Sequence, residues 1–485
     1  MKKDKNKLSS LNKNIISAII TKKWHFKYNP ITLLFSTRIN FEYLASMKSI
    51  FILVSYFLVS IYNCTPINPQ NNSIIKSQID KQWIDQVYKA GIKSVLIYKK
   101  GWELSFPIIA LNKDDQITLS FDELGTVKGD YSWSIMHCNS TWEQDELQSI
   151  EYISGHESVD VSESSFSQNT VTNYINYQID IPSKDCKILK SGNYIVKVCE
   201  RNNPENLILT NRFYVFEPLA ELYAKVDQLK VNIKEGLNQR VNIEINYDDS
   251  EISNPSENII IKILKNQGFE KTFANLKPSS LYNNTIKFEN MAELCFVGGN
   301  EYRHFDTKSI KFLSDRLLNI EKDAKGNHVF LTLDENRSVL PYNFKNDING
   351  RKSIKLENNE KSNIMADYCN VYFQLDAEIP LENGDFYIYG AITDWILDKN
   401  SKMVYDYNTK KFNAQLFIKQ GYYNYLYLFK TEDELFKSEQ YMYRIEGNNF
   451  QTENDYHILV YYRDIRSGYD KLISYFLASS SYSVD

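Results

Sequence analysis

The sequence predicts an all-β protein made of antiparallel β-sandwich domains arranged in tandem. Apolar and polar residues alternate along many short segments, which is the pattern of a strand with one buried face. Aromatic residues make up 14% of the chain, with 35 Tyr and 26 Phe, and such residues favour strands. Stretches rich in Asn, Asp, Ser and Lys separate the strands and supply turns. At 485 residues, the chain is long enough for about three domains.

The strand patterns and the turn-rich stretches between them indicate where each domain begins and ends. The clearest alternation is found at residues 117–121, 131–135, 194–198, 213–215, 241–247 and 456–462. One helix is expected, at residues 79–90, ahead of the first domain. We place a first β-sandwich at residues 85–218, a second β domain at 219–335, a connecting stretch at 336–363 and a C-terminal sandwich at 364–477.

The charge is distributed unevenly along the chain. Residues 1–64 hold ten of the 56 Lys and Arg but two of the 61 Asp and Glu, so the rest has 46 basic and 59 acidic residues. An acidic body is unsuited to neutralising phosphates, which excludes nonspecific nucleic-acid binding. A basic, apolar head on such a body is typical of a targeting segment.

An export signal is predicted at residues 47–64. The apolar run at residues 50–62 is too short to span a bilayer but suits the core of a signal peptide behind Met47 and Lys48. Cys64 stands where a lipoprotein signal places its acylated cysteine, so it is a candidate for lipidation. Cleavage near Cys64 without lipidation and a membrane anchor are the alternatives, since the residues just before Cys64 are not small.

Residues 1–46 do not fit this signal, because signal peptides begin at the N-terminus. We hypothesise that translation begins at Met47 and that residues 1–46 are a start-site extension. N-terminal sequencing and expression of a Met47→Ala variant test this, and a product that begins at Met1 contradicts it.

Residue types that carry catalysis are few and scattered. The chain has six His and 17 Gly and lacks the GxGxxG, GxxxxGK[ST], HExxH and GxSxG motifs. His137 and Cys138 are neighbours on a predicted strand, which sends their side chains to opposite faces and argues against a nucleophilic dyad. We therefore predict a protein that is not an enzyme and has no cofactor or metal. An exported hydrolase with an unrecognised carboxylate pair is an alternative.

The cysteines after Cys64 show no metal or redox spacing. There are five of them, without a CxxC motif, and an odd number excludes complete pairing within one chain. We expect buried free thiols, with a bridge between Cys138 and Cys199 as the alternative.

Aromatic residues near the C-terminus support a second class of function. Tyr423, Tyr425 and Tyr427 share one face of a predicted strand, where they either fill a core, the favoured interpretation, or stack on sugar rings. Trp395 follows a strand and a run of small residues, and with residues 421–425 this resembles the glycogen-binding module of the early-set, immunoglobulin-like class. An exported carbohydrate-binding protein is therefore the alternative function, although no second platform tryptophan is found.

Motifs spread over residues 92–475 resemble, in the same order, the type IX secretion system plug protein of Bacteroidota. In the first domain the motifs are residues 98–107 with Trp102, 119–122, 137–142 with His137 and Trp142, 191–198, and 209–213. Later motifs are residues 298–306 with Gly298, Gly299, Asn300, Phe305 and Asp306, then 347–350, 419–425 with Tyr423, and 452–456. Residues 1–46 fall outside the resemblance.

The resemblance implies a noncatalytic periplasmic subunit associated with the outer membrane. Such a subunit closes the periplasmic mouth of the giant outer-membrane β-barrel translocon when no substrate occupies the pore, so the barrel is the expected partner. Contact with the membrane is expected only through an N-terminal lipid. The motif residues are expected to be structural or interface positions. Because a plug must leave when cargo enters, its affinity is expected to be moderate.

Overall fold

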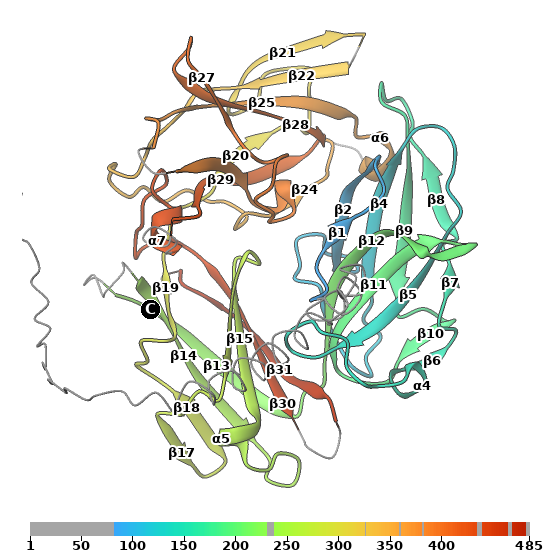
Figure 1. Ribbon diagram of the computed structural model, residues 1–485, viewed down its shortest axis with the longest axis vertical. Coiled ribbons are helices and arrows are strands. Elements are labelled where there is room, and N and C mark those ends of the chain that lie inside the picture. Colours follow the sequence, from blue (N-terminus) through green and yellow to red (C-terminus); the bar gives the residue numbers. More distant parts are fainter. Residues whose placement is uncertain are drawn as a thin grey trace, which may run out of the picture. The chain divides into compact units, whose positions relative to one another are not determined.

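Three β-sandwiches, each with its own core, make up the described part of the chain (Figure 1). The structure is a computed structural model, and it describes residues 82–229, 237–324, 326–357, 360–380, 383–433, 439–463 and 468–481. The sheets are mainly antiparallel, which confirms the predicted fold class. The predicted signal, Cys64 and residues 1–46 lie outside the described residues. Within the described ranges, no helix is long and apolar enough to cross a membrane.

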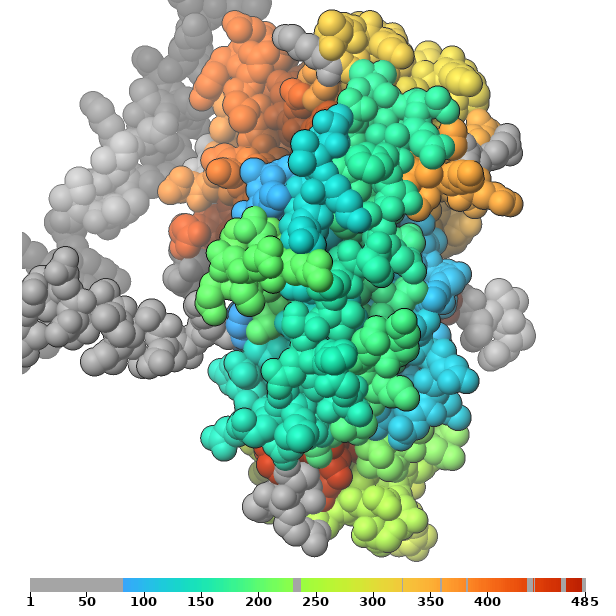
Figure 2. Space-filling model, turned by 90° about the vertical axis from the view of Figure 1, so that its right-hand side faces the viewer, coloured from blue at the N-terminus to red at the C-terminus, as the bar shows by residue number. Residues whose placement is uncertain are grey.

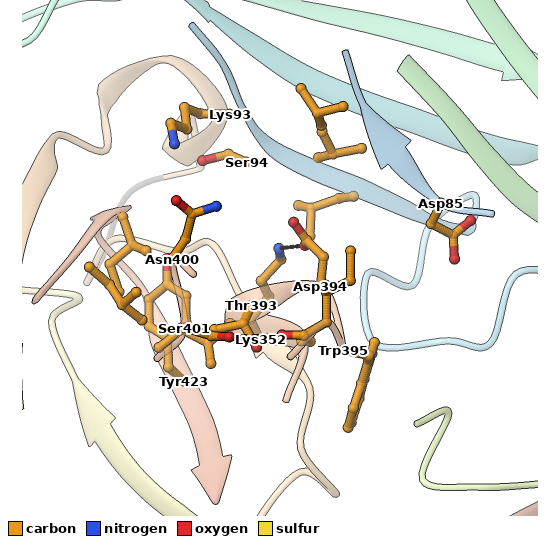
Figure 3. Close-up of a pocket in the computed structure, with 18 of the residues that line it drawn as sticks. Asp85, Lys93, Ser94, Lys352, Thr393, Asp394, Trp395, Asn400, Ser401 and Tyr423 are labelled. Atoms are coloured by element: carbon orange, nitrogen blue, oxygen red, sulfur yellow. Dashed lines mark hydrogen bonds and ion pairs between the residues drawn. The ribbon is translucent and has the colours of Figure 1, made fainter. Parts of the chain in front are cut away.

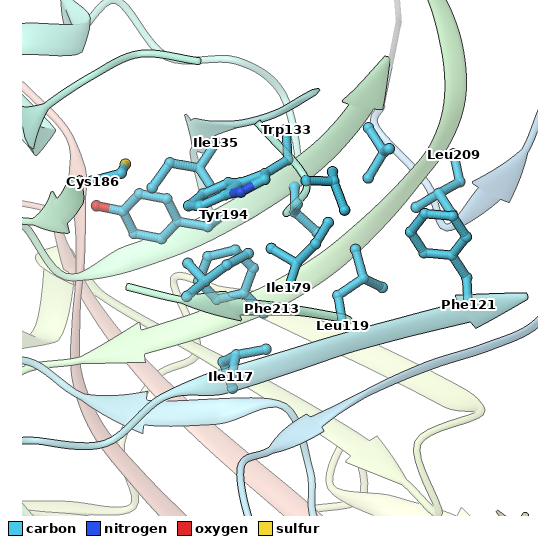
Figure 4. Packing of buried hydrophobic residues seen from close by; sticks show 14 of the residues in the cluster. Ile117, Leu119, Phe121, Trp133, Ile135, Ile179, Cys186, Tyr194, Leu209 and Phe213 are labelled. Atoms are coloured by element: carbon cyan, nitrogen blue, oxygen red, sulfur yellow. The ribbon is translucent and has the colours of Figure 1, made fainter. Parts of the chain in front are cut away.

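The first sandwich pairs a sheet of order β1-β12-β11-β5-β7 with a sheet of order β2-β4-β9-β8, and β3 runs beside β12. Large side chains from both sheets, among them Leu119, Trp133 and Tyr194, fill the space between the sheets (Figure 4). Its elements are β1 Gln86–Val87, β2 Ile92–Lys99, β3 Ile108–Ala110, β4 Ile117–Leu124, β5 Tyr131–Cys138, α4 Ser149–Tyr152, β6 Ile153–Gly155, β7 Val159–Asp160, β8 Glu163–Phe166, β9 Tyr174–Ile181, β10 Cys186–Ile188, β11 Gly192–Glu200 and β12 Asn203–Phe216.

The second sandwich is closed by strands from the far end of the chain. One sheet has the order β13-β14-β18-β17 with β19 beside β14, and the other has the order β16-β15-β30-β31. Its elements are β13 Ala220–Gln228, β14 Leu237–Tyr247, α5 Pro255–Asn258, β15 Ile259–Lys265, β16 Phe269–Ala274, β17 Ser280–Tyr282, β18 Thr285–Phe288, β19 Cys295–Val297, β30 Asp455–Arg463 and β31 Asp470–Ser479.

The third sandwich is an insertion between β19 and β30. One sheet has the order β21-β22-β25-β28-β27 with β23 beside β25, and β29 pairs with β20, β24 and β26 in the other. Its elements are β20 Arg303–Asp306, β21 Leu317–Asp323, β22 Gly326–Leu331, β23 Asp334–Glu335, β24 Lys352–Ser353, α6 Ser362–Met365, β25 Tyr368–Asp376, β26 Gly384–Tyr389, η3 Ala391–Thr393, β27 Val404–Asp406, β28 Lys411–Lys419, β29 Tyr422–Thr431 and α7 Glu439–Met442.

Two expectations from the sequence differ from this arrangement. Residues 364–477 were expected to form one C-terminal sandwich, yet β30 pairs with β15, so the last two strands belong to the second sandwich. Local periodicity reports which face of a strand is buried but not which sheet the strand joins. The helix expected at residues 79–90 is absent from its described part, where β1 pairs with β12 instead.

The cysteines of the described residues are all buried and unpaired, as expected, so Cys138 and Cys199 do not form a bridge. Burial raises the pKa of Cys138 to about 12, and the charge of nearby Asp145 adds to this. The Cys138 side chain is therefore a neutral thiol at physiological pH and a poor nucleophile.

Because the third sandwich is inserted into the second, we predict that the C-terminal strand β30 stabilises the second sandwich. Ile458 of β30 is completely buried in the second core, opposite Ile263 of β15. Ile458→Ala should lower the free energy of unfolding by about 2–5 kcal/mol, measured by urea denaturation. Leu477 on neighbouring β31 is 42% exposed, and Leu477→Ala, as the control, should cost less than about 1 kcal/mol. Equal losses in the two variants would contradict the assignment.

Candidate functional site

Charged and polar side chains are buried where the first and third sandwiches meet. The Lys419 ammonium lies 2.6 Å from the Asp122 carboxylate, and both side chains are almost completely buried. Tyr368 and Asn176 also donate to Asp122, each at 2.8 Å. Burial raises the pKa of Asp122 and lowers the pKa of Lys419, while their mutual attraction opposes both shifts. The ion pair therefore forms only when β28, which carries Lys419, is correctly placed against β4, which carries Asp122.

A second contact between these sandwiches is centred on Asp367. Its carboxylate accepts hydrogen bonds from the backbone N–H groups of Val171 and Thr172, at 2.8 and 3.0 Å. The Tyr174 hydroxyl donates to the Ala366 carbonyl at 2.7 Å. Backbone groups of the first sandwich are thus fixed by the third.

The first and second sandwiches meet through an apolar layer. Trp142 and Tyr214 pack there with Leu459 and Leu472, and the layer is flanked by a hydrogen bond of 2.7 Å from Tyr461 to Asn193. Figure 2 shows the face that the first sandwich forms, with the third sandwich above it and the second below.

The chain crosses from the second sandwich into the third at Gly298 and Gly299. The Gly298 N–H donates to Asn238 at 2.8 Å, and a Cβ on Gly298 would lie 2.0 Å from the Asn449 carbonyl oxygen. Gly299 has φ +73°, a left-handed backbone conformation that glycine adopts without strain. Asn300 donates to the Glu446 carbonyl at 2.7 Å. The outgoing and returning chains touch here, and only glycine fits between them.

A network of five charged side chains lies beside this crossing. The carboxylate of Glu446, fully buried, pairs with Arg303 at 3.1 Å and Arg337 at 2.5 Å. Asp334 pairs with Arg303 at 2.8 Å. Burial alone would raise the pKa of Glu446, but Arg303 and Arg337 hold it below its usual value. Arg316 also pairs with Asp334, at 2.5 Å, so the network holds three arginines and two carboxylates. It fixes β20 against the segment that returns to β30.

Three carboxylates approach one another on the same side of the crossing. Asp347 accepts the N–H groups of Tyr302 and Asn349, at 2.5 and 2.6 Å, and Glu301 accepts the N–H of Glu453 at 3.1 Å. Burial raises the pKa of Asp347 to about 7, and the charges of Glu301 and Glu453 contribute. Across the described residues, no group of His, Cys, Asp or Glu is arranged to hold a metal ion.

A groove of about 1410 Å³ lies where the three sandwiches meet. Figure 3 shows Lys93 and Ser94 of β2 on one side, with Trp395 and the ion pair of Lys352 and Asp394, 2.8 Å apart, on the other. A smaller hollow of about 260 Å³ lies beside β8 and β9.

The motif residues named from the sequence are dispersed over the fold. Trp142, Phe305 and Tyr423 are buried in cores, where Phe305 stacks on Tyr423 at 5.3 Å between ring centres. His137 is buried, hydrogen-bonded to Asp145 and to the Ser191 carbonyl at 3.0 Å.

Two motif residues remain closer to solvent. Asp306 accepts the Lys308 N–H at 2.8 Å and pairs with the Lys308 ammonium at 3.0 Å. Trp102 is 60% exposed at the tip of the loop between β2 and β3. Trp102 is therefore the one residue of the named motif set that offers a large apolar surface to a partner.

The residues that join the sandwiches were not found from the sequence. Asp122, Lys419, Glu446 and Arg303 sit in an acidic, lysine-rich chain where any charge is expected to be solvated. All of these residues except Glu446 lie inside motif segments named above, at residues 119–122, 298–306 and 419–425. A motif does not distinguish a solvent-facing charge from a paired one.

Comparison with known proteins agrees with this architecture. Residues 92–217 match the model of the type 9 secretion system plug protein 1st domain. The solved structure of a hypothetical protein from Parabacteroides merdae is similar, with 31% sequence identity and a TM-score of 0.77 over 82% of this chain and 100% of that one. No protein with a curated function matches.

The fold and its junctions define an all-β body of three sandwiches that are joined by buried polar contacts. Residues 92–217, in its first sandwich, match the model of the plug protein's first domain, and the similar solved structure covers 82% of the chain. The chain belongs to the type 9 secretion system plug protein family, and its role is related to that secretion system.

From the close contact at the crossing, we predict that Gly298 cannot be replaced without a loss of stability. Gly298→Val should lower the free energy of unfolding by more than about 2 kcal/mol, because the new side chain meets the Asn449 backbone. Gly468→Ala is the control: Gly468 has φ +70° but open space around it, so the loss should be about 1 kcal/mol. An unchanged melting temperature in Gly298→Val, together with lost partner binding, would make this segment an interface loop instead.

The raised pKa of Asp347 predicts that stability depends on pH. The folded state holds a proton on Asp347 that the unfolded state, with the ordinary value of 3.8, releases earlier. The stabilisation is complete below about pH 4 and is lost as the pH rises through about 7. Asp347→Asn should therefore reduce the fall in unfolding free energy between pH 4 and pH 8 by at least about 1 kcal/mol. Asp376→Asn, which changes an exposed carboxylate, should follow the wild type.

Proposed function

We propose that this protein is the noncatalytic periplasmic plug of the type IX secretion system. In this proposal it closes the periplasmic mouth of the giant outer-membrane β-barrel translocon while no substrate fills the pore. Membership of the plug protein family supports the proposal. The proposal also places the protein in the periplasm, in contact with the outer membrane through its partner.

The observation that carries the proposal is that buried ion pairs join the sandwiches. A plug acts by shape, so its parts must not move relative to one another when it meets the barrel. The pair of Lys419 with Asp122 spans the junction of the first and third sandwiches, and Lys265 of β15 pairs with Glu439 of α7 at 3.0 Å between the second and the third. Removing one partner of such a pair costs about 3–5 kcal/mol, because the other charge is left buried and unpaired. Sliding the sandwiches apart carries a similar penalty at each junction.

The tyrosine face that supported the alternative of a carbohydrate-binding protein does not lie on the surface. Tyr423, Tyr425 and Tyr427 are buried in the core of the third sandwich, so they cannot stack against sugar rings. Trp395 is half-buried, and its ring packs against Tyr302 and Tyr389. The favoured expectation of a tyrosine core is confirmed.

The proposal predicts a leak when the protein is missing. Deleting its gene should make the outer membrane permeable to small dyes and antibiotics, because an unplugged giant barrel is an open hole, while secretion continues in part. Dye uptake is compared with that of a strain lacking both this protein and the barrel, which should not leak. Equal uptake in the two strains, or no uptake in either, contradicts the plug function.

A further inference from the structure

Three carboxylates lie on the three chain segments that meet at the crossing between the second and third sandwiches. Glu301 is on the outgoing chain between β19 and β20, and Glu453 is on the returning chain just before β30. Asp347 is on a loop of the third sandwich, between β23 and β24. The three side chains therefore belong to segments that are far apart in the sequence and come together only when the third sandwich is in place.

Hydrogen bonds join these segments in a closed triangle. The Glu453 N–H donates to Glu301 at 3.1 Å and ties the returning chain to the outgoing one. The Asn349 side-chain amide donates to Glu453 at 3.3 Å, which ties the loop to the returning chain. The Tyr302 N–H donates to Asp347 at 2.5 Å, which ties the loop to the outgoing chain. Because each carboxylate is the acceptor on one side of the triangle, the joint between the two sandwiches depends on all three.

The negative charges of this cluster have no cations of their own. Within the described ranges, no ion pair is found for any of the three carboxylates. Arg337 and Arg351 lie on neighbouring segments, but they pair with Glu446 and Asp455. Burial raises the pKa values of the tyrosines next to the cluster, which stay neutral: Tyr302, Tyr342 and Tyr422. Three ionised carboxylates would therefore repel one another in a site that is largely shielded from water.

Two buried oxygen atoms of the triangle have no hydrogen-bond donor among the described residues. They are Glu301 Oε2 and Asn349 Oδ1, and these residues are 1% and 5% exposed. A buried acceptor without a donor is unfavourable, and a protonated carboxyl supplies an O–H donor. The His, Cys, Asp and Glu side chains of the described part of the chain are not arranged to hold a metal ion. A proton is thus the ligand that meets both needs, since it reduces the charge and adds a donor.

We propose that a proton shared among Glu301, Asp347 and Glu453 holds the crossing closed, and that the crossing opens locally when this proton is released to solvent. Because the three carboxylates interact, the proton belongs to the cluster rather than to one residue. The inference goes beyond the proposed function and does not depend on it.

The direction of the pH effect follows from the burial of the cluster. Burial raises the pKa of Asp347 to about 7, and it also raises the pKa of Glu301. The closed crossing therefore binds the proton more tightly than the open one does. The stabilisation is complete below about pH 4 and is lost as the pH rises through about 7.

The test is hydrogen–deuterium exchange of the full-length protein, read by mass spectrometry at the backbone amides of Tyr302, Asn349 and Glu453. These amides donate to the carboxylates of the cluster. After correction for the intrinsic exchange rate, their protection should fall at least tenfold between about pH 5 and about pH 8, as expected for a pKa near 7. Protection of Val196, in the core of the first sandwich, should hardly change.

Two matched variants assign the effect to the cluster. Glu301→Gln/Asp347→Asn removes two of the three charges and supplies amide donors in place of the proton, so its crossing should be equally protected at both pH values. Asp376→Asn/Glu378→Gln makes the same chemical change at two exposed carboxylates of the third sandwich and should keep the wild-type fall. The fall in the wild type is required whatever the variants do.

Four results would each overturn the inference. They are unchanged protection in the wild type, the same fall in the cluster variant, the loss of the fall in the control variant, and an equal fall at Val196, which would mean that the whole protein is destabilised. Calcium chloride added to the wild type at about pH 8 should not restore protection. If it does, and the cluster variant does not respond, the cluster is a metal site and the proton is not its ligand.

Discussion

The buried ion pair of Lys419 with Asp122 sets the position of the third sandwich on the first. Two charges removed from water gain little net free energy from each other, so the pair does not hold the fold together by its strength. Its effect is selective, because any shift of β4 relative to β28 leaves two charges unpaired in a site that water does not reach. Tyr368 of the third sandwich also donates to Asp122 and requires the same arrangement, while Asn176 donates to Asp122 from within the first sandwich.

The same logic applies at the crossing between the second and third sandwiches. Lys265 of β15 pairs with Glu439 of α7, and the chain passes through at Gly298 with no room for a side chain. The apolar layer around Trp142 supplies hydrophobic burial, and the polar groups at its border fix the orientation. Together the three junctions hold the sandwiches in one arrangement, which is what the proposed plug function requires.

The strands could be predicted from the sequence because their alternation is local. The segments around Leu119, Trp133 and Tyr194 became strands whose apolar faces meet in one core. Partner choice is not local, so the union of β30 with β15 was missed, and so was the second buried face of β4. On β4 the residues Ser120 and Asp122 read as solvent-facing, but the third sandwich covers them. The groove could not be predicted from the sequence either, because its walls come from all three sandwiches.

Inserting the third sandwich into the second has a consequence for how the molecule is made. A chain that emerges from its N-terminus has Ile261 and Ile263 of β15 in place long before their neighbours on β30 exist. Until residues 455–479 arrive, one sheet of the second sandwich has an open edge and an uncovered apolar face. Incomplete chains thus display the features that proteases and chaperones recognise, and only a complete chain hides them. Because of this strand order, the second sandwich closes only after the C-terminal strands β30 and β31 have been synthesised.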